Sequence, residues 1–490
     1  MSDSTPVYDR PHPDGGAIVS RIDQLRTRLQ AVGQSHLLTF AADLKESELG
    51  GLLTQVEAID FDQLPALIER YVRSDAPALI PGDLEPAPYY ARGSGEWDVR
   101  HYRSIGEDLL EAGRVACFTV AGGQGSRLGY EGPKGCYPTA PVSGKSLFQI
   151  FAEKIRGAER TYGADVPWYV MTSPINHDET RRFFARWDYF DLDPQRIMFF
   201  MQGTMPSFDK ATGRILLADK GVIATNPDGH GGALRALHAS GAVADMKRRG
   251  IDVLSYFQVD NPNVNITDPV FIGLHAGAPD SSGEMSSKMV PKSGPEEKVG
   301  VFCRSGGKLQ VIEYSDLPAA LASERDAHGR LRFLAGSIAI HMLGVSFIEK
   351  VNADPCFALP WHRAVKKVPH IDLETRQFVE PKEPNAVKLE RFVFDAIPLA
   401  RSSIVLETDR VEEFAPVKNA TGVDSIETSR QLQTEKAARW LESVGIKIPR
   451  RADGRPDCVL ELSGVTAIEP DRLDLQSLPQ SIDPGSVVAI

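Results

Sequence analysis

Apolar and polar positions follow two different patterns along the chain. From 17 to about 75, apolar residues recur at the three- and four-residue spacing of amphipathic helices. From 103 onward, short apolar runs that are typical of buried strands alternate with amphipathic segments. This alternation predicts an α/β fold in which a mixed, mostly parallel sheet is flanked by helices.

The expected elements can be placed by residue number. Strands are predicted at 115–121, 168–172, 197–201, 253–259 and 458–462, and helices at 64–72, 104–113, 146–161, 177–187, 234–249 and 429–443. Between 281 and 332 the pattern changes to short strands joined by turns, at 288–290, 300–303 and 309–314. That change indicates an antiparallel insertion in the main domain.

Three regions are expected. Residues 1–102 combine a polar lead-in of about 16 residues, expected to be disordered, with an all-helical cap and a proline-rich connector. Residues 103–385 form the central α/β domain with its antiparallel insertion. Residues 386–490 form a C-terminal region, and its part beyond 428 is expected to be a small separate lobe.

Composition narrows the class of protein. A chain of 490 residues with 42% hydrophobic and 25% charged residues is typical of a globular protein of two or three domains. The net charge of −11 argues against broad binding to nucleic acid or to anionic membranes. Five scattered cysteines without CxxC spacing suggest a reducing compartment and no zinc site. Neither a signal peptide nor a membrane span is visible, so a cytoplasmic location is expected.

The stretch from Val115 to Pro138 carries the first candidate site. A buried strand is followed at once by Gly122, Gly123 and Gly125. Glycines after a strand allow backbone N–H groups to approach a phosphate, and two cations, Arg127 and Lys134, follow within the same segment. A tight turn that merely carries two solvated cations is the alternative, but the combination favours a phosphate site.

Two common nucleotide motifs fit this stretch poorly. A Walker A loop needs Ser or Thr after its lysine, whereas Gly135 follows Lys134. The dinucleotide fingerprint needs G-x-G-x-x-G, whereas this chain has one residue more before its last glycine. The following strand also ends without the acidic residue that holds a ribose, so an NAD-dependent oxidoreductase is a weak alternative.

Polar residues follow other predicted strands at the same sheet edge. Asp260 ends the strand 253–259 and could hold Mg2+, although it could also cap the turn before Pro262. Gln202 follows the strand 197–201, and its amide could pair with a nucleobase. The loop 227–232 offers backbone donors and His230, or simply caps the next helix.

An ordered series of motifs extends from about 35 to 428. The motifs are SHLLTF, AGGQGSRLG with PKG, SGKSLFQIFAEKI, WYVMTSPIN, FFMQGTMP, PDGHGGALRAL, VDNPNVNITDP, VGVFCRSGGKLQVIEYSDL, KKVPHID, KLERFVFD and EFAPVKNA. Together they resemble the eukaryotic-type UDP-N-acetylhexosamine (UDP-N-acetylglucosamine) pyrophosphorylases, within the UTP–sugar-1-phosphate uridylyltransferases. The resemblance implies a Rossmann-like nucleotidyltransferase domain that uses UTP, a sugar 1-phosphate and Mg2+.

The resemblance also implies residue roles. Those expected to bind UTP are Ala121, Gly122, Gly123, Gly125, Lys134, Gln202, Gly229 and Asp260. Those expected to line the sugar pocket are His230, Gly300, Glu313, Tyr314, Ser337, Phe392 and Phe394. Arg127, Lys134 and Lys418 are the expected catalytic cations, and Asp260 is the expected metal ligand.

Two departures from the family leave the sugar open. N-acetylhexosamine members carry an asparagine where this chain has His230, and another, associated with the acetamido group, where it has Ser337. N-acetylglucosamine 1-phosphate is the first expectation, and glucose 1-phosphate or a broad range of sugar 1-phosphates is the alternative. A UDP-sugar-binding protein without turnover is a third. Neither nucleic acid nor membrane is expected as a partner, and the sequence leaves the oligomeric state open.

Overall fold

The structure of the chain is a computed structural model that describes residues 13–74, 80–354, 357–476 and 478–490. Contacts group these residues into two compact units. The first unit contains the described residues up to 74 together with Thr204–Gly229 and Trp361–Arg391. The second contains the described residues of 80–203, His230–Pro360 and Phe392–Ile490. The three-region division expected from the sequence stays a prediction.

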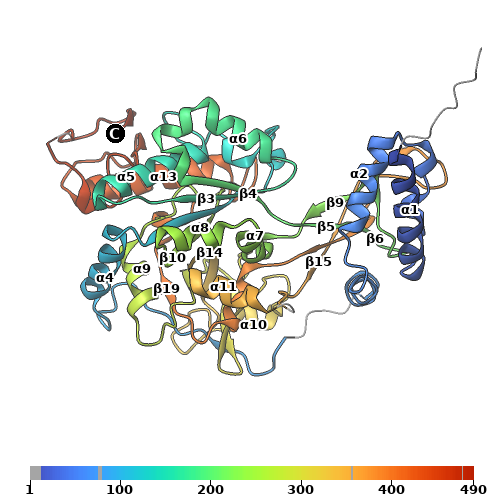
Figure 1. Cartoon of the computed structure of the whole chain (residues 1–490). Helices are drawn as coiled ribbons and strands as arrows, with labels where there is room; N and C mark the ends of the chain where they lie inside the picture. The colour runs from blue at the N-terminus through green and yellow to red at the C-terminus, as the bar shows by residue number, and fades with distance from the viewer. Residues whose placement is uncertain (1–12, 75–79, 355–356, 477) are drawn as a thin grey trace, which may run out of the picture. The chain divides into compact units, whose positions relative to one another are not determined.

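One large sheet organises the second unit (Figure 1). Its strands within the described residues are β1 (Glu85–Pro86), β2 (Val115–Val120), β3 (Trp168–Thr172), β4 (Ile197–Met201), β10 (Val253–Gln258), β11 (Met285–Pro291), β12 (Val301–Ser305), β13 (Lys308–Ile312), β14 (Ala335–Gly344) and β19 (Val405–Glu407). The order is β1-β12-β14-β10-β2-β3-β4, while β13 pairs with β12, and β11 pairs with both β14 and β19.

Strand directions divide this sheet into two parts. β10, β2, β3 and β4 run parallel to one another, and β14 joins β10 in antiparallel fashion. The α/β class with a mixed sheet is thus confirmed. The short antiparallel strands expected between 281 and 332 are present as β11, β12 and β13, and they belong to the main sheet: β11 and β12 pair with β14, and β13 pairs with β12. Local alternation predicts strands but does not report their distant partners.

The helices of the second unit are α4 (Val99–Glu111), α5 (Leu147–Tyr162), α6 (His177–Arg186), α7 (Ala233–Ala239), α8 (Ala242–Arg249), α9 (Pro269–Gly277), α10 (Ala319–Ser323), α11 (Val345–Ala353), α12 (Arg410–Glu413) and α13 (Ile426–Ser443). The expected helix 146–161 is confirmed as α5, which Ser146 caps through a reciprocal capping box with Gln149. The single helix expected at 234–249 is wrong: Gly241, with φ +82°, separates α7 from α8.

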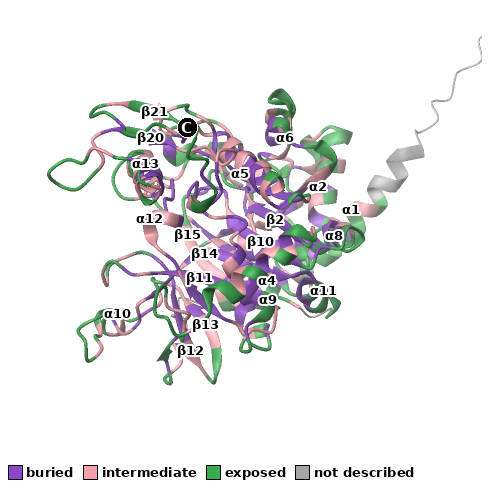
Figure 2. Cartoon of the chain, turned by 90° about the vertical axis from the view of Figure 1, so that its left-hand side faces the viewer, coloured by how far each residue is buried: buried purple, intermediate pink, exposed green. Residues whose placement is uncertain are grey.

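Apolar residues fill both faces of the sheet. Alternate residues of a strand point to opposite faces, and Val115 and Cys117 of β2 join a cluster with α5, whereas Ala116 and Phe118 join one with α7, α8 and α11. Figure 2 shows β2, β10 and β14 as largely buried. Strands covered on both faces need continuous apolar runs, which explains why the sequence identified them.

The C-terminal part of the second unit has its own apolar cluster. β20 (Val459–Glu461) pairs in parallel with β21 (Val487–Ala489), and buried residues such as Leu460 pack against Trp440 and Leu441 of α13. The helix expected at 429–443 and the strand expected at 458–462 are therefore confirmed, α13 beginning three residues earlier, at Ile426.

The first unit mixes helices with short strands. Its elements within the described residues are α1 (Pro13–Ala31), α2 (Glu46–Glu57), α3 (Leu64–Leu67), β5 (Thr204–Pro206), β6 (Phe208–Asp209), β7 (Leu217–Asp219), β8 (Val222–Ile223), β9 (Thr225–Pro227), β15 (His362–Lys366), β16 (His370–Ile371), β17 (Phe378–Val379) and β18 (Ala386–Glu390). Residues of α1 and α2 share one core with residues of β6, β7 and β18.

This shared core corrects the expectation of an all-helical cap, because strands from two distant segments complete the unit. The helix α1 begins at Pro13, so the last residues of the expected lead-in are helical. Residues 1–12, where the rest of that lead-in was expected, lie outside the described residues.

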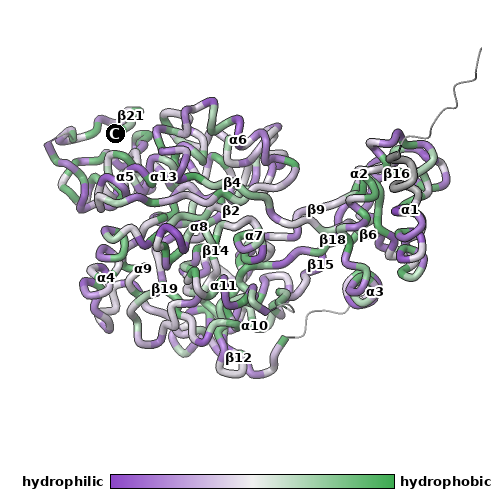
Figure 3. Tube along the Cα trace, viewed as in Figure 1, coloured by the Kyte–Doolittle hydropathy of each residue, from purple (hydrophilic) through white to green (hydrophobic). Residues whose placement is uncertain are grey.

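No helix of the described ranges is long and apolar enough to cross a membrane, and Figure 3 shows apolar and polar residues interspersed along the chain. The four described cysteines, Cys117, Cys136, Cys303 and Cys458, are buried and form no disulfide with one another. Cys356 lies outside the described residues.

A carboxyl group of the first unit gives a pH-dependent prediction. Burial raises the pKa of Asp228 to about 6, and its Oδ1 has no hydrogen-bond partner within the described ranges. Because the pKa is higher in the folded state than in the unfolded state, the free energy of unfolding falls as pH rises from about 4 to about 6 and then stays constant. We expect Asp228→Asn to increase the free energy of unfolding by about 2–3 kcal/mol at pH 8 and by roughly half of that at pH 5. Urea unfolding at both pH values measures the gain, and a gain that is the same at both would contradict the prediction.

Candidate active site

The glycine loop after β2 is held through its carbonyl groups. The carbonyl oxygens of Ala121 and Gly123 accept hydrogen bonds from Asn176 Nδ2 at 3.0 and 3.2 Å. The carbonyl oxygen of Gly122, between them, accepts a hydrogen bond from Ser173 Oγ at 2.9 Å. Both donors are fully buried and follow β3, so two neighbouring strand ends fix three consecutive peptide groups of the loop.

This arrangement directs donors to the other side of the loop. In a trans peptide the N–H group points away from the preceding carbonyl, so the N–H groups of Gly122, Gly123 and Gln124 face away from Ser173 and Asn176. These three N–H groups make no hydrogen bond within the part of the chain that the structure describes. Successive N–H groups of this kind can form a concave anion site. The phosphate site expected from the sequence stays a prediction.

Sequence reasoning did not single out Ser173 or Asn176. Both are ordinary polar residues in isolation, and the only available signal was their position directly after the strand 168–172, at the sheet edge that also carries the glycine loop.

Gln202 reaches this loop from the end of β4. Its side chain is 7% exposed, and its Oε1 lies so close to Gly122 that a Cβ there would be only 2.2 Å away. Only glycine at 122 leaves room for this approach. The structure therefore brings together Gln202 and the glycine loop, as expected for two parts of one nucleotide site.

The loop's lysine meets the carboxylate at the end of β10. Lys134 Nζ lies 3.3 Å from Asp260 Oδ2, and the Lys134 backbone N–H donates to the Gly123 carbonyl at 3.0 Å. Both side chains are mostly buried, so water screens this ion pair less than a surface pair. Arg127, in the short helix Ser126–Leu128, is exposed and forms no ion pair within the described residues.

Lys418 is tied to the same point of the sheet. The Val417 N–H donates to the Asp260 carbonyl at 2.8 Å, which fixes the backbone beside Lys418. Lys418 Nζ lies 3.4 Å from Asp424 Oδ2 and 5.5 Å from the centre of the Phe414 ring. Asp260 thus contacts Lys134 of the glycine loop through its side chain and the residue before Lys418 through its backbone.

A pocket of the second unit opens beside this cluster. Predicted residues that line it are His230, Asp260, Gly300, Glu313, Tyr314, Ser337, Phe394 and Lys418. Gln258 and Lys298, which the sequence analysis did not single out, also line it. All the residues expected for the sugar except Phe392 therefore share one pocket with the expected metal ligand.

His230 is held in one orientation. Its Nδ1 accepts a hydrogen bond from the Val393 N–H at 3.1 Å, so the neutral ring carries its proton on Nε2. The ring stacks on Phe392 at 5.2 Å and meets the edge of Phe394 at 6.0 Å. These three of the predicted sugar-site residues are therefore in mutual contact, although Phe392 is not itself part of the pocket wall.

A bulge in β14 forms one wall of the pocket. The pairing with β11 moves from Ser287–His341 to Met289–Ser337, so β14 has two extra residues there. Ala339 within the bulge has φ +54°, which is unusual for a residue other than glycine. Bulges re-aim side chains beside functional sites, and this one places Ser337 against the Gly300 backbone, with the Ser337 N–H donating to the Gly300 carbonyl at 2.8 Å.

The buried His341 adds no positive charge behind this wall. Burial, and secondarily the nearby His230, lower the pKa of His341 to about 3, so its ring is neutral at physiological pH. Positive charge along the pocket wall comes instead from Lys298 and Lys418.

Gly229 lies in the first unit, so its expected place beside the uracil stays a prediction. A Cβ at this position would lie 2.3 Å from the Arg391 carbonyl oxygen, and φ is +85°. Glycine is therefore required here by the fold of the first unit itself.

The donor set around Asp260 decides what kind of metal ion would fit. Within the described ranges no three His, Cys, Asp or Glu side chains cluster to hold a metal ion. Mg2+ commonly takes only one or two carboxylates and completes its shell with water and substrate phosphates. Asp260, beside a phosphate-binding loop, fits a cation that arrives with a nucleotide rather than a permanent metal centre.

Comparisons with known proteins show what the chain resembles. The family model described as UTP–glucose-1-phosphate uridylyltransferase matches residues 95–438. The UDP-N-acetylhexosamine pyrophosphorylase-like protein 1 of Xenopus tropicalis is 35% identical over 94% of this chain and 97% of its own. The UDP-N-acetylglucosamine pyrophosphorylase of Saccharomyces cerevisiae is 36% identical over 84% of this chain and 90% of its own. The uridine diphosphate N-acetylglucosamine pyrophosphorylase of Trypanosoma brucei, solved with an inhibitor, is 27% identical, with a TM-score of 0.77 over 96% of this chain and 98% of its own.

Proposed function

Because the chain belongs to the UTP–glucose-1-phosphate uridylyltransferase family, we propose that it forms a UDP-sugar and pyrophosphate from UTP and a sugar 1-phosphate, most readily N-acetylglucosamine 1-phosphate. The observation that carries the proposal is the contact between Lys134 and Asp260, which joins the glycine loop to the pocket of expected sugar residues.

The reaction needs no protein nucleophile. A phosphate oxygen of the sugar 1-phosphate, already anionic, attacks the α-phosphorus of UTP. The new P–O bond forms as the bond from the α-phosphorus to the bridging oxygen of the β-phosphate breaks, and pyrophosphate leaves with that electron pair. Catalysis therefore consists of positioning two anions that repel each other and of neutralising their charge.

The residues of the loop would serve the nucleotide. The N–H groups of Gly122, Gly123 and Gln124 would bind phosphate oxygens, and Gln202 would pair with the uracil. Arg127 and Lys134 would stabilise the leaving pyrophosphate, and Lys418 would screen the incoming phosphate from the α-phosphate. Asp260 would hold Mg2+, which when bound neutralises phosphate charge and orients the reactants.

The choice of sugar rests on the relatives and on the pocket. The two curated relatives compared above are named for N-acetylhexosamine or N-acetylglucosamine, which favours an acetamido sugar. Ser337 is shorter than asparagine and has no amide, so we propose that a water molecule bridges it to the acetamido group. Turnover of glucose 1-phosphate or of a broad range of sugar 1-phosphates is the second candidate, which is favoured by His230 in the pocket wall, where N-acetylhexosamine members carry an asparagine.

Side-by-side kinetics test the sugar. With UTP and Mg2+, kcat/KM for N-acetylglucosamine 1-phosphate should exceed that for glucose 1-phosphate by about tenfold or more. Ser337→Asn should widen this ratio, and Ser337→Ala should narrow it. A higher kcat/KM for glucose 1-phosphate in the wild type would replace the acetamido proposal with the second candidate.

We also propose a cytoplasmic location, with UTP and a sugar 1-phosphate as the partners and neither nucleic acid nor a membrane among them. The four buried, unpaired cysteines of the described residues are compatible with a reducing compartment.

The clamp on the glycine loop gives a kinetic prediction. Asn176→Ala leaves two loop carbonyls without their donor, so we expect KM for UTP to rise about tenfold or more, while KM for the sugar 1-phosphate changes less than threefold. Asn352→Ala is the matched control, because Asn352 also donates to two backbone carbonyls but lies on α11. Equal changes of both KM values in Asn176→Ala would contradict a specific role in the nucleotide site.

A further inference from the structure

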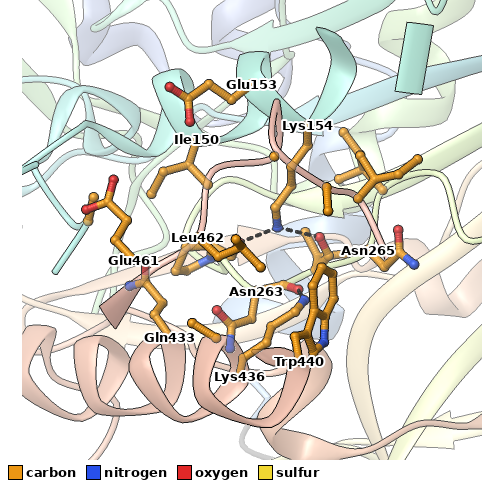
Figure 4. A pocket seen from close by; sticks show the side chains of 18 of the residues that line it. Ile150, Glu153, Lys154, Asn263, Asn265, Gln433, Lys436, Trp440, Glu461 and Leu462 are labelled. Carbon is orange, nitrogen blue, oxygen red and sulfur yellow. Dashed lines mark hydrogen bonds between the residues drawn. The ribbon is translucent and has the colours of Figure 1, made fainter. Parts of the chain in front are cut away.

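Two lysine side chains lie beside the segment that follows Asp260. Lys154 extends from α5 and Lys436 from α13, and Figure 4 shows both side chains directed into one cavity, which residues 262–267 also line. Burial, followed by the charge of Lys436, lowers the pKa of Lys154 well below its usual value, and burial also lowers the pKa of Lys436. Burying two amines close together costs free energy, so other interactions must compensate for it.

The compensating interactions are hydrogen bonds from the two amines to backbone carbonyls. Lys154 Nζ donates to the carbonyls of Pro262 and Val264 (Figure 4), and Lys436 Nζ donates to the carbonyl of Asn263 at 2.8 Å. Three consecutive carbonyls directly after Asp260 and Asn261 are therefore each bound by an amine. Lysine suits this task because one long side chain carries several N–H donors.

The same lysine of α13 also holds the segment that leads to Lys418. Lys436 Nζ donates to the Glu412 carbonyl at 2.7 Å, at the end of α12. Asn261 then joins the two segments: its Nδ2 donates to the Glu413 carbonyl at 2.6 Å, and its Oδ1 accepts from the Ala415 N–H at 3.0 Å. Together with the bond from the Val417 N–H to the Asp260 carbonyl, these contacts make 260–264 and 412–418 one bonded assembly.

We propose that Lys154 and Lys436 are positioning residues for uridylyl transfer, which fix Asp260 and Lys418 relative to each other before the substrates bind. This inference rests on the proposed function, in which Asp260 holds the metal ion and Lys418 approaches the incoming phosphate. Removal of either amine would leave inward-facing carbonyls unpaired, and the segment would turn to find other donors. The positioning role of Lys436 also gives its helix, α13, a part in the active site, although α13 need not touch a substrate.

Methionine variants test the proposal, because Lys154→Met and Lys436→Met retain length and lose every donor. We expect kcat to fall about tenfold to a hundredfold in each. We also expect about tenfold weaker binding of Mn2+, a paramagnetic substitute for Mg2+, measured by electron paramagnetic resonance in the presence of UTP. UTP binding without metal should change less than twofold, because Ser173 and Asn176 hold the glycine loop independently.

Lys247→Met is the matched control, since Lys247 is an exposed lysine of α8 that pairs with Glu349 at the surface. It should leave kcat and Mn2+ binding within twofold of the wild type. Wild-type kcat and Mn2+ binding in the Lys154 and Lys436 variants would overturn the proposal. Equal losses of Mn2+ binding and of metal-free UTP binding, in variants that remain folded, would also overturn it.

If the methionine variants do not fold, a measurement on the wild type still tests the proposal. Hydrogen–deuterium exchange of the ligand-free chain should find the Ala415 and Val417 amides protected, and UTP with Mn2+ should slow their exchange less than twofold. Rapid exchange that slows only when ligands bind would show that the substrates, and not the lysines, order the segment. Failure of the proposed function has a different result, namely no pyrophosphate release by the wild type, whatever the exchange and the Mn2+ titrations give.

Discussion

Asp260→Asn should reduce kcat about a thousandfold, a larger effect than we expect from any other single substitution. The amide has the shape of the carboxylate but not its charge, so it cannot neutralise a metal ion or anchor Lys134 through an ion pair. The rate at saturating UTP and sugar 1-phosphate, measured over a range of Mg2+ concentrations, should remain low and should require more Mg2+ for half of its maximum.

Asp252→Asn is a suitable control for this substitution. Asp252 lies just before the opposite end of β10, where it pairs with Arg114 and is half exposed. It should leave kcat within twofold of the wild type. If Asp260→Asn retained more than a tenth of the wild-type turnover with an unchanged Mg2+ requirement, Asp260 would not be the metal ligand.

Loss of either cation of the glycine loop should have the next largest effect. We expect Arg127→Gln and Lys134→Met each to lower kcat about a hundredfold or more, because each removes a charge that stabilises the leaving pyrophosphate. Arg127→Gln is the cleaner test, since Arg127 is exposed and forms no ion pair among the described residues, so the substitution should leave the free energy of unfolding unchanged.

Lys134→Met also leaves Asp260 without its ion-pair partner, so its thermal midpoint needs to be measured with its turnover. Arg182→Gln, an exposed arginine of α6, controls for the loss of charge alone and should retain full activity. Near-normal turnover in Arg127→Gln or Lys134→Met would remove that residue from the mechanism.

The sequence was most informative where chemistry is local. The strand 115–121, its glycines and Lys134 lie within one short segment, and continuous apolar runs marked the buried strands. Asp260 could be placed at the same sheet edge because the carboxyl ends of parallel strands meet there. The contact with Lys134 follows from that topology.

Contacts between distant segments could not be predicted in the same way. Pairing of β11 with both β14 and β19 places the expected insertion in the main sheet, and neither partner is adjacent in sequence. The core of the first unit likewise gathers helices near residue 50 and strands beyond 200 and 360. Periodicity describes the faces of an element but does not say which other element covers them.

The residues that hold the backbone of the site could not be recognised from their types. Ser173, Asn176, Lys154 and Lys436 act through backbone carbonyls, and no spacing rule distinguishes them from surface residues. The break at Gly241 was visible as a glycine, but a single glycine within a helical pattern is tolerated too often to mark a boundary by itself.

The stoichiometry of the products tests whether the chain transfers a uridylyl group. With purified protein, UTP, Mg2+ and N-acetylglucosamine 1-phosphate, we expect one pyrophosphate to be released for each UDP-N-acetylglucosamine formed, and no release without the sugar 1-phosphate. Tight binding of UTP with no pyrophosphate release from any of the N-acetylglucosamine, N-acetylgalactosamine or glucose 1-phosphates would contradict it. The chain would then be a nucleotide-sugar-binding protein that keeps the fold of an enzyme.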